Sequence, residues 1–370
     1  MKNVKKIGCA LLVLFWGIII HTTVVSAASL DDYDLDDLDG YVDESEFEID
    51  YTDIVTSIYN ADSDYEKGIV NAMFSKLIAE ARGLLKTVSL ILGVILCGAV
   101  FKNVTDILKE GTVMKTGAFV TYITVMLLLF VTFEGGFTIT ENACGKVMEF
   151  LYALIPTFFC AVTFTGGNLT GMVMYQWTGL CISMIHIIVI QFLLPLTNYY
   201  VILALVNNGM EEQKFGSLCR LIRKAILYVN RGMLGLIVGM TTIKSLTVPL
   251  ADNVKNTFLK KAIALIPGIG NGVESIAETV AGTGNLIKNT IGAAGLVTVV
   301  LLIAVPFIKL LVMNVMVRLI AAVTEPVANK NVTAGMNAVS DGIGILQYLI
   351  STSSVVLMIT IGIICMATGV

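Results

Sequence analysis

The stretch that decides the fold is residues 292–321, GAAGLVTVVLLIAVPFIKLLVMNVMVRLIA. About 20 consecutive apolar residues let a helix cross a bilayer, so this stretch predicts a membrane span. It also carries Pro306, Lys309 and Arg318. The segment before it places polar side chains on one helical face and apolar side chains on the other. These polar residues are Glu274, Glu278, Asn285, Lys288 and Asn289. We expect a helix whose polar face lies along a polar partner or along water, as in a conduit wall.

Composition places the whole chain among membrane proteins. Of its 370 residues, 56% are hydrophobic and only 14% are charged, and the mean hydropathy is +0.84. A soluble domain of this size buries far less apolar surface. We therefore predict an all-α, polytopic membrane protein. Its apolar stretches, each long enough for a span or half-span, are 84–104, 117–133, 150–166, 172–194, 195–209, 232–250, 292–321 and 343–368.

The N-terminal part predicts export. Residues 1–28 have three lysines, an apolar run and small residues before Ala28, which is typical of a signal peptide; an uncleaved anchor helix is the alternative. Residues 29–66 hold 15 Asp and Glu with no Lys or Arg, and we expect a disordered, exported acidic segment. Residues 67–150 should contain an amphipathic helix on the membrane surface, followed by the first two spans.

Charge between the apolar stretches predicts the topology. The lysines of residues 102–115 should be cytoplasmic, and the acidic segment 134–149 should be an outside loop. The basic residues of 214–231 should again be cytoplasmic. That requires residues 172–209 to cross the membrane twice, or to enter and return near Pro195.

An internal repeat is a further prediction. Residues 153–156 and 264–267 both read ALIP, and the same offset of 111 residues aligns Pro195 with Pro306 without a gap. The two repeat halves would be residues 151–261 and 262–370. The offset then matches Asn198 with Lys309, which would place polar groups at equivalent depths, as in transporters with broken helices.

Prolines and a lysine mark candidate functional positions within the apolar stretches. A proline in a span removes a backbone hydrogen bond and clashes with the preceding turn, so each should kink or break its helix. The prolines are Pro156, Pro195, Pro267 and Pro306. Lys309 costs about 2.5–3.5 kcal/mol at a bilayer centre unless it reaches the interface, faces a watery cavity or pairs with Glu278 or Glu274. If Glu278 and Lys309 pair, losing both should harm the protein less than the separate losses suggest.

Residue types that carry enzymatic chemistry are scarce in this sequence. It has two histidines, its seven cysteines show no CxxC spacing, and the glycines of residues 268–272 lack the lysine of a phosphate loop. We expect a protein that is not an enzyme, with no catalytic, cofactor-binding or metal-binding residues and no nucleic-acid partner.

The chain resembles the stage III sporulation protein AE family over nearly its whole length, strongly in residues 262–327 and loosely before residue 150. The residues that carry the resemblance are Ile266, Pro267, Gly268, Ser275–Val280, Gly282, Leu286, Ile287, Lys288, Asn289, Gly292, Ala294, Gly295, Pro306, Lys309, Glu325 and Pro326. The order of a signal peptide, an acidic exported segment and several spans agrees with it.

The resemblance implies a function and a location. It implies a non-enzymatic part of the channel complex that joins the mother cell to the forespore, in the mother-cell membrane around the forespore, with the N-terminal segment outside the cytoplasm. The implied partners are companion stage III sporulation proteins, namely an ATPase, small membrane subunits and ring-forming subunits, together with a forespore partner. We also expect contact with membrane lipid, and a homo-oligomer is left open. A self-sufficient secondary transporter of a small solute is the alternative.

A reporter fusion tests the expected export. An alkaline phosphatase fused after Asp64 should be active, because that enzyme needs the oxidising exterior and the signal and acidic segment should carry it there. A β-galactosidase fused at the same position should be inactive. The opposite pair of results would contradict an exported N-terminus.

Overall fold

The computed structural model describes residues 82–100, 111–164, 168–210, 212, 214–236 and 270–367, together with Ser75, Ile78, Ala79 and Gly239. These residues form helices and short turns, and no strand occurs among them. The helices are α5 (Gly111–Phe164), α6 (Asn168–His186), the π-helix η2 (Ile187–Leu193), α7 (Leu194–Gly209), α9 (Gly270–Thr324) and α10 (Lys330–Ala367). Two further helical stretches are residues 82–100 and 216–236.

Five described segments are long and apolar enough to cross a membrane, which confirms the predicted all-α, polytopic class. They are Arg82–Val100, Thr116–Pro156, Gln176–Gly209, Ile291–Thr324 and Lys330–Gly362. The protein is a multi-pass membrane protein. At 54 and 55 residues, α5 and α9 are each about 80 Å long, more than twice the thickness of the hydrocarbon layer.

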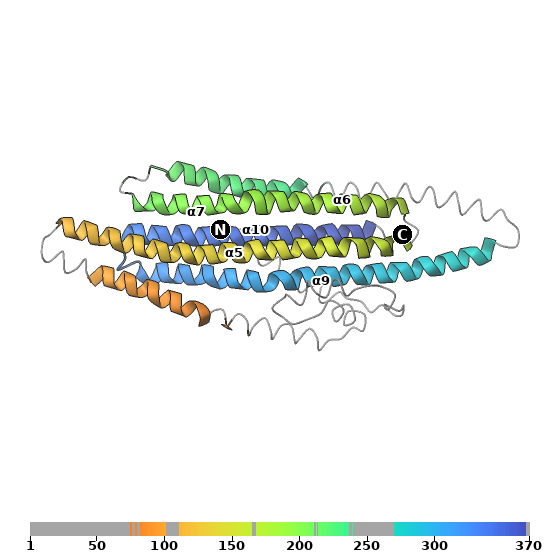
Figure 1. Cartoon of the computed structure of the whole chain (residues 1–370), viewed down its shortest axis with the longest axis horizontal. Helices are drawn as coiled ribbons and strands as arrows, with labels where there is room; N and C mark the ends of the chain where they lie inside the picture. Colours follow the sequence, from red (N-terminus) through yellow and green to blue (C-terminus); the bar gives the residue numbers. More distant parts are fainter. Residues whose placement is uncertain are drawn as a thin grey trace.

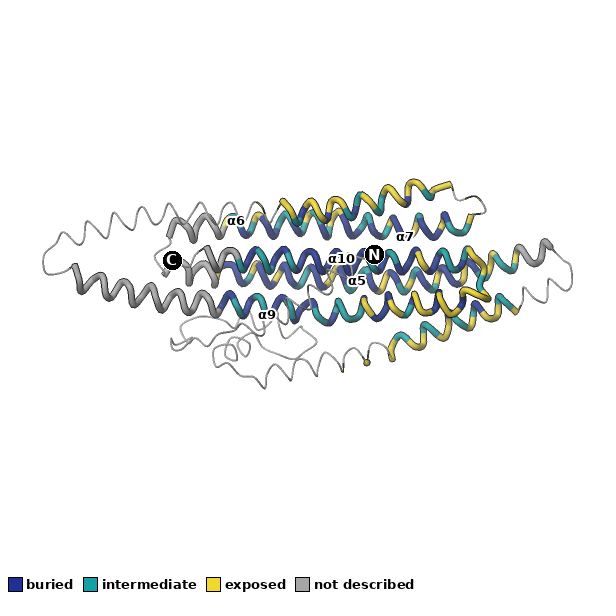
Figure 2. Tube along the Cα trace, turned by 180° about the vertical axis from the view of Figure 1, so that it is seen from behind, coloured by how far each residue is buried: buried dark blue, intermediate teal, exposed yellow. Residues whose placement is uncertain are grey.

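Helix α10 lies at the centre of the bundle. It packs against α5, α7 and α9, and residues 223 and 230 of the helix 216–236 bond to it (Figure 1). Buried residues predominate along its described length, whereas the helix 82–100 is mostly exposed (Figure 2). The centre of the described bundle is therefore filled by a helix whose side chains pack against those of its neighbours.

The long helices correct the predicted topology. Residues 117–133 and 150–166 were expected as separate spans, but α5 is continuous to Phe164, so the acidic segment 134–149 lies within a helix rather than in a loop. Residues 172–209 likewise form one continuous rod through α6, η2 and α7. The start of α5 and the end of α7 lie at the same end of the bundle (Figure 1), so α5 and the rod of α6, η2 and α7 each run once along the bundle, and no re-entry near Pro195 is needed.

Each proline was predicted to kink or break its helix, and Pro156 and Pro306 do not break theirs. Pro156 lies inside α5 and Pro306 inside α9, and both helices continue beyond them. Pro195 is in the first turn of α7, directly after the π-helix, where the Leu194 N–H reaches back five residues to the Val189 carbonyl. A wider turn before the proline accommodates its missing donor. Pro267 lies outside the described residues.

The chain trace contradicts a repeat that superposes from end to end. The first window, 153–210, reverses direction between α5 and α6. Under the 111-residue offset, that reversal corresponds to residues 276–278, which lie inside the unbroken helix α9. The window 264–321 therefore has a different course at its start.

The later parts of the two windows agree better. The rod from α6 to α7 and the helix α9 run in the same direction along α10 (Figure 1). Val201 lies against Gly342, and Asn314 bonds to Ser340 and Gln347. The stretches that follow the two prolines therefore meet the same part of α10, so Pro195 and Pro306 lie at similar depth.

Gly342 provides a test of this packing. A Cβ at this position would overlap Val201, whose branched side chain has little rotamer freedom, and would press on Phe133 at 3.1 Å. Gly342→Ala should lower the free energy of unfolding by about 1–3 kcal/mol, as overpacked cores do. Unfolding in detergent micelles, monitored by near-UV circular dichroism, measures this change.

Gly135→Ala is the matched control, because nothing lies within 4 Å of a Cβ there and the helix α5 gains a better helix former. Equal stability of the two variants would contradict the close contact of α7 with α10.

Candidate functional site around the central helix

A chain of hydrogen bonds connects α9 to α10 inside the bundle. The Asn314 Nδ2 donates to Gln347 Oε1 at 2.9 Å, and the Ser340 Oγ donates to Asn314 Oδ1 at 2.8 Å. The Arg318 Nε donates to the Ser340 Oγ at 2.7 Å. We call these four residues the polar seam. Asn314, Ser340 and Gln347 are all buried.

Helical spacing explains how the sequence builds the polar seam. Asn314 and Arg318 are four residues apart on α9, and Ser340 and Gln347 are seven apart on α10, so each pair lies on one face of its helix. Asn314 is at the centre because its carboxamide supplies both a donor and an acceptor. Removing it would leave both neighbours short of a partner in a medium without water to replace it.

Two polar contacts attach the helix 216–236 to the other side of α10. The Arg223 Nη1 donates to Asp341 Oδ2 at 2.7 Å, with the arginine side chain 40% and the aspartate side chain 29% exposed. Deeper along α10, the Asn230 Nδ2 donates to Thr352 Oγ1 at 3.0 Å, and both residues are buried. Polar contacts thus fix α10 in rotation and register on two sides.

The polar network around α10 holds this helix to its neighbours through hydrogen bonds. Most of its polar atoms are engaged with one another, and the α10 hydroxyls of Ser351, Ser353, Ser354 and Thr360 donate to carbonyls of their own helix. Among the described residues, no group of three or more His, Cys, Asp or Glu side chains is placed to hold a metal ion.

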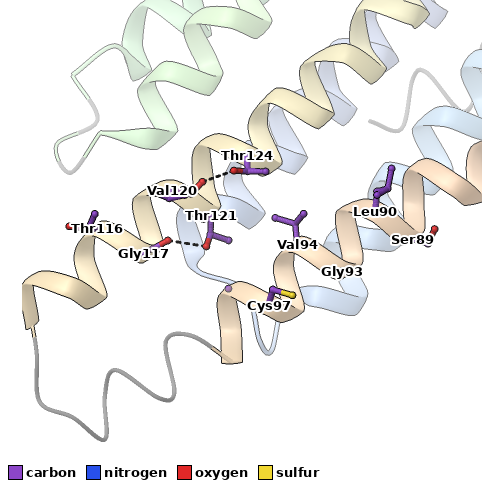
Figure 3. A pocket seen from close by; sticks show the side chains of 11 residues that line it. Ser89, Leu90, Gly93, Val94, Cys97, Thr116, Gly117, Val120, Thr121 and Thr124 are labelled. Atoms are coloured by element: carbon purple, nitrogen blue, oxygen red, sulfur yellow. Dashed lines mark hydrogen bonds between the residues drawn. The ribbon is translucent and has the colours of Figure 1, made fainter.

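A groove of about 900 Å³ lies away from this network, between residues 89–98 and 116–124 (Figure 3). The hydroxyls of Thr121 and Thr124 bond to the carbonyls of Gly117 and Val120, each at 2.9 Å, within their own helix. These donors are already used. The lining of the groove is therefore mainly apolar.

The polar face predicted before the span lies in α9, as expected for a helix. The backbone of residues 270–290 is helical. The side chains of Glu274, Glu278, Asn285, Lys288 and Asn289 lie outside the described residues, so their conduit-lining role stays a prediction.

The predicted pairing of Glu278 with Lys309 is wrong. Both residues belong to the same unbroken helix α9, 31 positions apart. At 1.5 Å per residue this separation is about 46 Å, far beyond the reach of two side chains. Because the two residues do not pair, we no longer expect the effects of their substitutions to be coupled. Lys309 is half-buried, at the depth where Thr352 meets Asn230.

Of the other predicted positions, Arg318 belongs to the polar seam, whereas Asn198 is half-buried on α7 and its Oδ1 has no hydrogen-bond partner among the described residues.

Sequence reasoning missed most of the network. The residues it did not single out for the site are Arg223, Asn230, Asn314, Ser340, Asp341, Gln347 and Thr352. A signal was present, because an apolar span that carries Ser340, Asp341, Gln347 and residues 351–354 has too many polar groups to face lipid on any side. Such a span indicates a central helix with polar neighbours.

Comparison with known proteins gives two matches. The sequence model of the family described as "Stage III sporulation protein AE" matches residues 49–368. The "Stage III sporulation protein AE" of Bacillus subtilis (strain 168) is 22% identical over 281 residues, which cover 76% of this chain and 69% of that protein. No solved structure matches the chain.

Replacing the central residue of the polar seam tests its contribution to stability. Asn314→Leu should lower the free energy of unfolding by about 1–3 kcal/mol, because Gln347 and Ser340 each lose a buried partner. Adding Gln347→Leu to that variant should cost less than Gln347→Leu alone costs in the native chain. Unfolding in detergent micelles measures both values.

The control is Asn337→Leu, which changes an exposed asparagine on α10. If Asn314→Leu is no less stable than this control, the polar seam does not hold α9 to α10.

Proposed function

The chain belongs to the stage III sporulation protein AE family, and we propose that it is a non-enzymatic membrane component of the channel that joins the mother cell to the forespore. Its role in sporulation follows from the family, which the match over residues 49–368 establishes. The channel role, the mother-cell membrane and the companion subunits belong to the proposal.

The observation that carries the proposal is the position of α10. A helix packed on several sides fills the place where a single-copy permease would keep its path, and the polar seam bonds this helix to α9. A protein whose central position is filled by a helix would form part of the wall of a conduit, and would not enclose the conduit by itself. We infer that the conduit is formed between this chain and its neighbours.

The length of α9 supports a role in assembly. Its apolar span is Ile291–Thr324, so residues 270–290 precede the span as one further helical stretch of about 30 Å. The polar residues predicted for that stretch would suit contact with soluble or membrane-surface partners. Those partners, in our proposal, are the companion ATPase, small membrane subunits and ring-forming subunits, and a forespore protein across the intermembrane space.

The proposal is tested in sporulating cells and with the purified protein. Glu278→Ala, in the polar stretch of α9, should reduce the yield of heat-resistant spores more than Glu44→Ala in the acidic leader, at equal protein abundance. Affinity purification of the native chain from sporulating cells should retrieve the companion subunits, and Glu278→Ala should retrieve fewer of them.

Transport by the chain alone distinguishes the alternative. In liposomes that contain only the purified chain, a panel of labelled small solutes should not be carried faster than in empty liposomes. Saturable uptake of one solute would favour the secondary transporter and contradict the proposed channel subunit.

A further inference from the structure

Two helices on the surface of the bundle carry opposite charges on their exposed faces. The helix 216–236 presents a basic stripe, and α5 presents an acidic stripe; every residue of both is exposed. The basic stripe is Arg220, Lys224 and Arg231, and the acidic stripe is Glu134, Glu141 and Glu149. Spacings of four, seven and eight residues keep each set on one face of its helix.

The main charges of both stripes are unpaired within the described chain. Arg220 donates to the Ser217 Oγ at 2.9 Å, but Lys224 and Arg231 form no ion pair with a described residue, and neither do Glu134 and Glu141. Arg223, the residue before Lys224, differs from these residues because its side chain points inward and pairs with Asp341. The charges of the two stripes face away from their own bundle.

The central helix α10 gives the depth of each basic residue. Arg223 meets Asp341 and Asn230 meets Thr352, so the helix 216–236 runs in the same direction as α10. Lys224, one residue after Arg223, is therefore level with residue 342 or 343.

The residues of α10 also give the depth of the acidic stripe. Phe133 lies against Gly342, and Gly136 lies against Leu346, so α5 also runs in the direction of α10. Glu134 is therefore level with residue 343, at the depth of Lys224. Seven residues further along each helix, Glu141 and Arg231 again lie at nearly the same depth.

Large apolar side chains surround these charges on the same surfaces. Leu221 and Tyr228 are 64% and 66% exposed beside the basic stripe, and Leu127 and Val131 are 61% and 69% exposed just before the acidic stripe. Exposed apolar side chains gathered in this way mark a surface that another protein or lipid covers. An unpaired charge among them needs an opposite charge or water at its own depth.

We propose that a second copy of this chain, in the same membrane and orientation, places its acidic stripe on the basic stripe of the first copy, pairing Lys224 with Glu134 and Arg231 with Glu141. Copies in one membrane share the same depth, so both pairs form at once. The seven-residue spacing, about 10 Å along each helix, is common to the two stripes.

The contact joins two different faces, so it is heterologous and leaves one free face on each outer copy. Successive copies then extend the row or close it into a ring. The inference deepens the proposed function by naming a partner of the chain, but its test uses purified protein. Failure of the channel role in cells and failure of self-association are therefore distinguishable.

Charge reversal tests the contact. A basic-face variant, Lys224→Glu with Arg231→Glu, carries acidic residues on both faces, and an acid-face variant, Glu134→Lys with Glu141→Lys, carries basic residues on both. Each variant reconstituted alone in vesicles should be monomeric. The native chain should form dimers or larger assemblies, counted by single-molecule photobleaching of a labelled terminus.

Mixing the two variants should restore association, because the reversed face of each then meets the reversed face of the other. Far-UV circular dichroism verifies that both variants fold. The control, Arg220→Glu with Glu149→Lys, reverses charges at the stripe ends, where the other helix offers no counterpart at the same depth, and should associate like the native chain.

Three results would overturn the proposal. These are a monomeric native chain, variants that assemble like the native chain on their own, and folded variants that stay monomeric when mixed.

Discussion

The structure depends on the satisfaction of polar groups where no water is available. Asn314 illustrates the constraint, because its carboxamide donates to Gln347 and accepts from Ser340 within the packed interface of α9 and α10. A hydrocarbon surrounding offers no replacement for either bond. The contact therefore sets the rotation of both helices, and the close approach of Gly342 to α7 follows from the same placement of α10.

Charge is distributed around α10 according to the same constraint. Arg223 faces inward and pairs with Asp341, and the Asn230 Nδ2 donates to Thr352. Residues such as Lys224 and Glu134 face outward and have none within the described chain. The described bundle pairs Arg223 with Asp341 inside and leaves Lys224 and Glu134 on its outer surface without an ion pair among the described residues. That is the form expected of one subunit in an assembly.

Hydropathy was sufficient to predict the helical membrane class and most of the apolar segments, because the length of an apolar run determines whether it can cross a bilayer. It failed at α5, where the charges of residues 134–149 were interpreted as a loop. Charges do not end a helix when they lie on one exposed face, as Glu134 and Glu141 do. Helical periodicity failed for Lys309, whose predicted partner Glu278 lies in the same helix. Periodicity predicts which residues share a face of one helix, but not which faces of two helices are in contact. The polar residues of α10 were a signal for a central helix, but which residue pairs with which in the polar seam depends on tertiary packing.

The central position of α10 has a consequence for biosynthesis. Because a ribosome makes the chain from its N-terminus, α5, α7 and α9 enter the membrane before the helix that they surround. Until then, Asn314 and Arg223 have no lasting partner, and the newly inserted helices depend on the insertion machinery or on chaperones for protection. A late stop codon that removes α10 would therefore delete the middle of the bundle rather than its edge. The cell would recognise such a product as unassembled, and its quality-control proteases would degrade it.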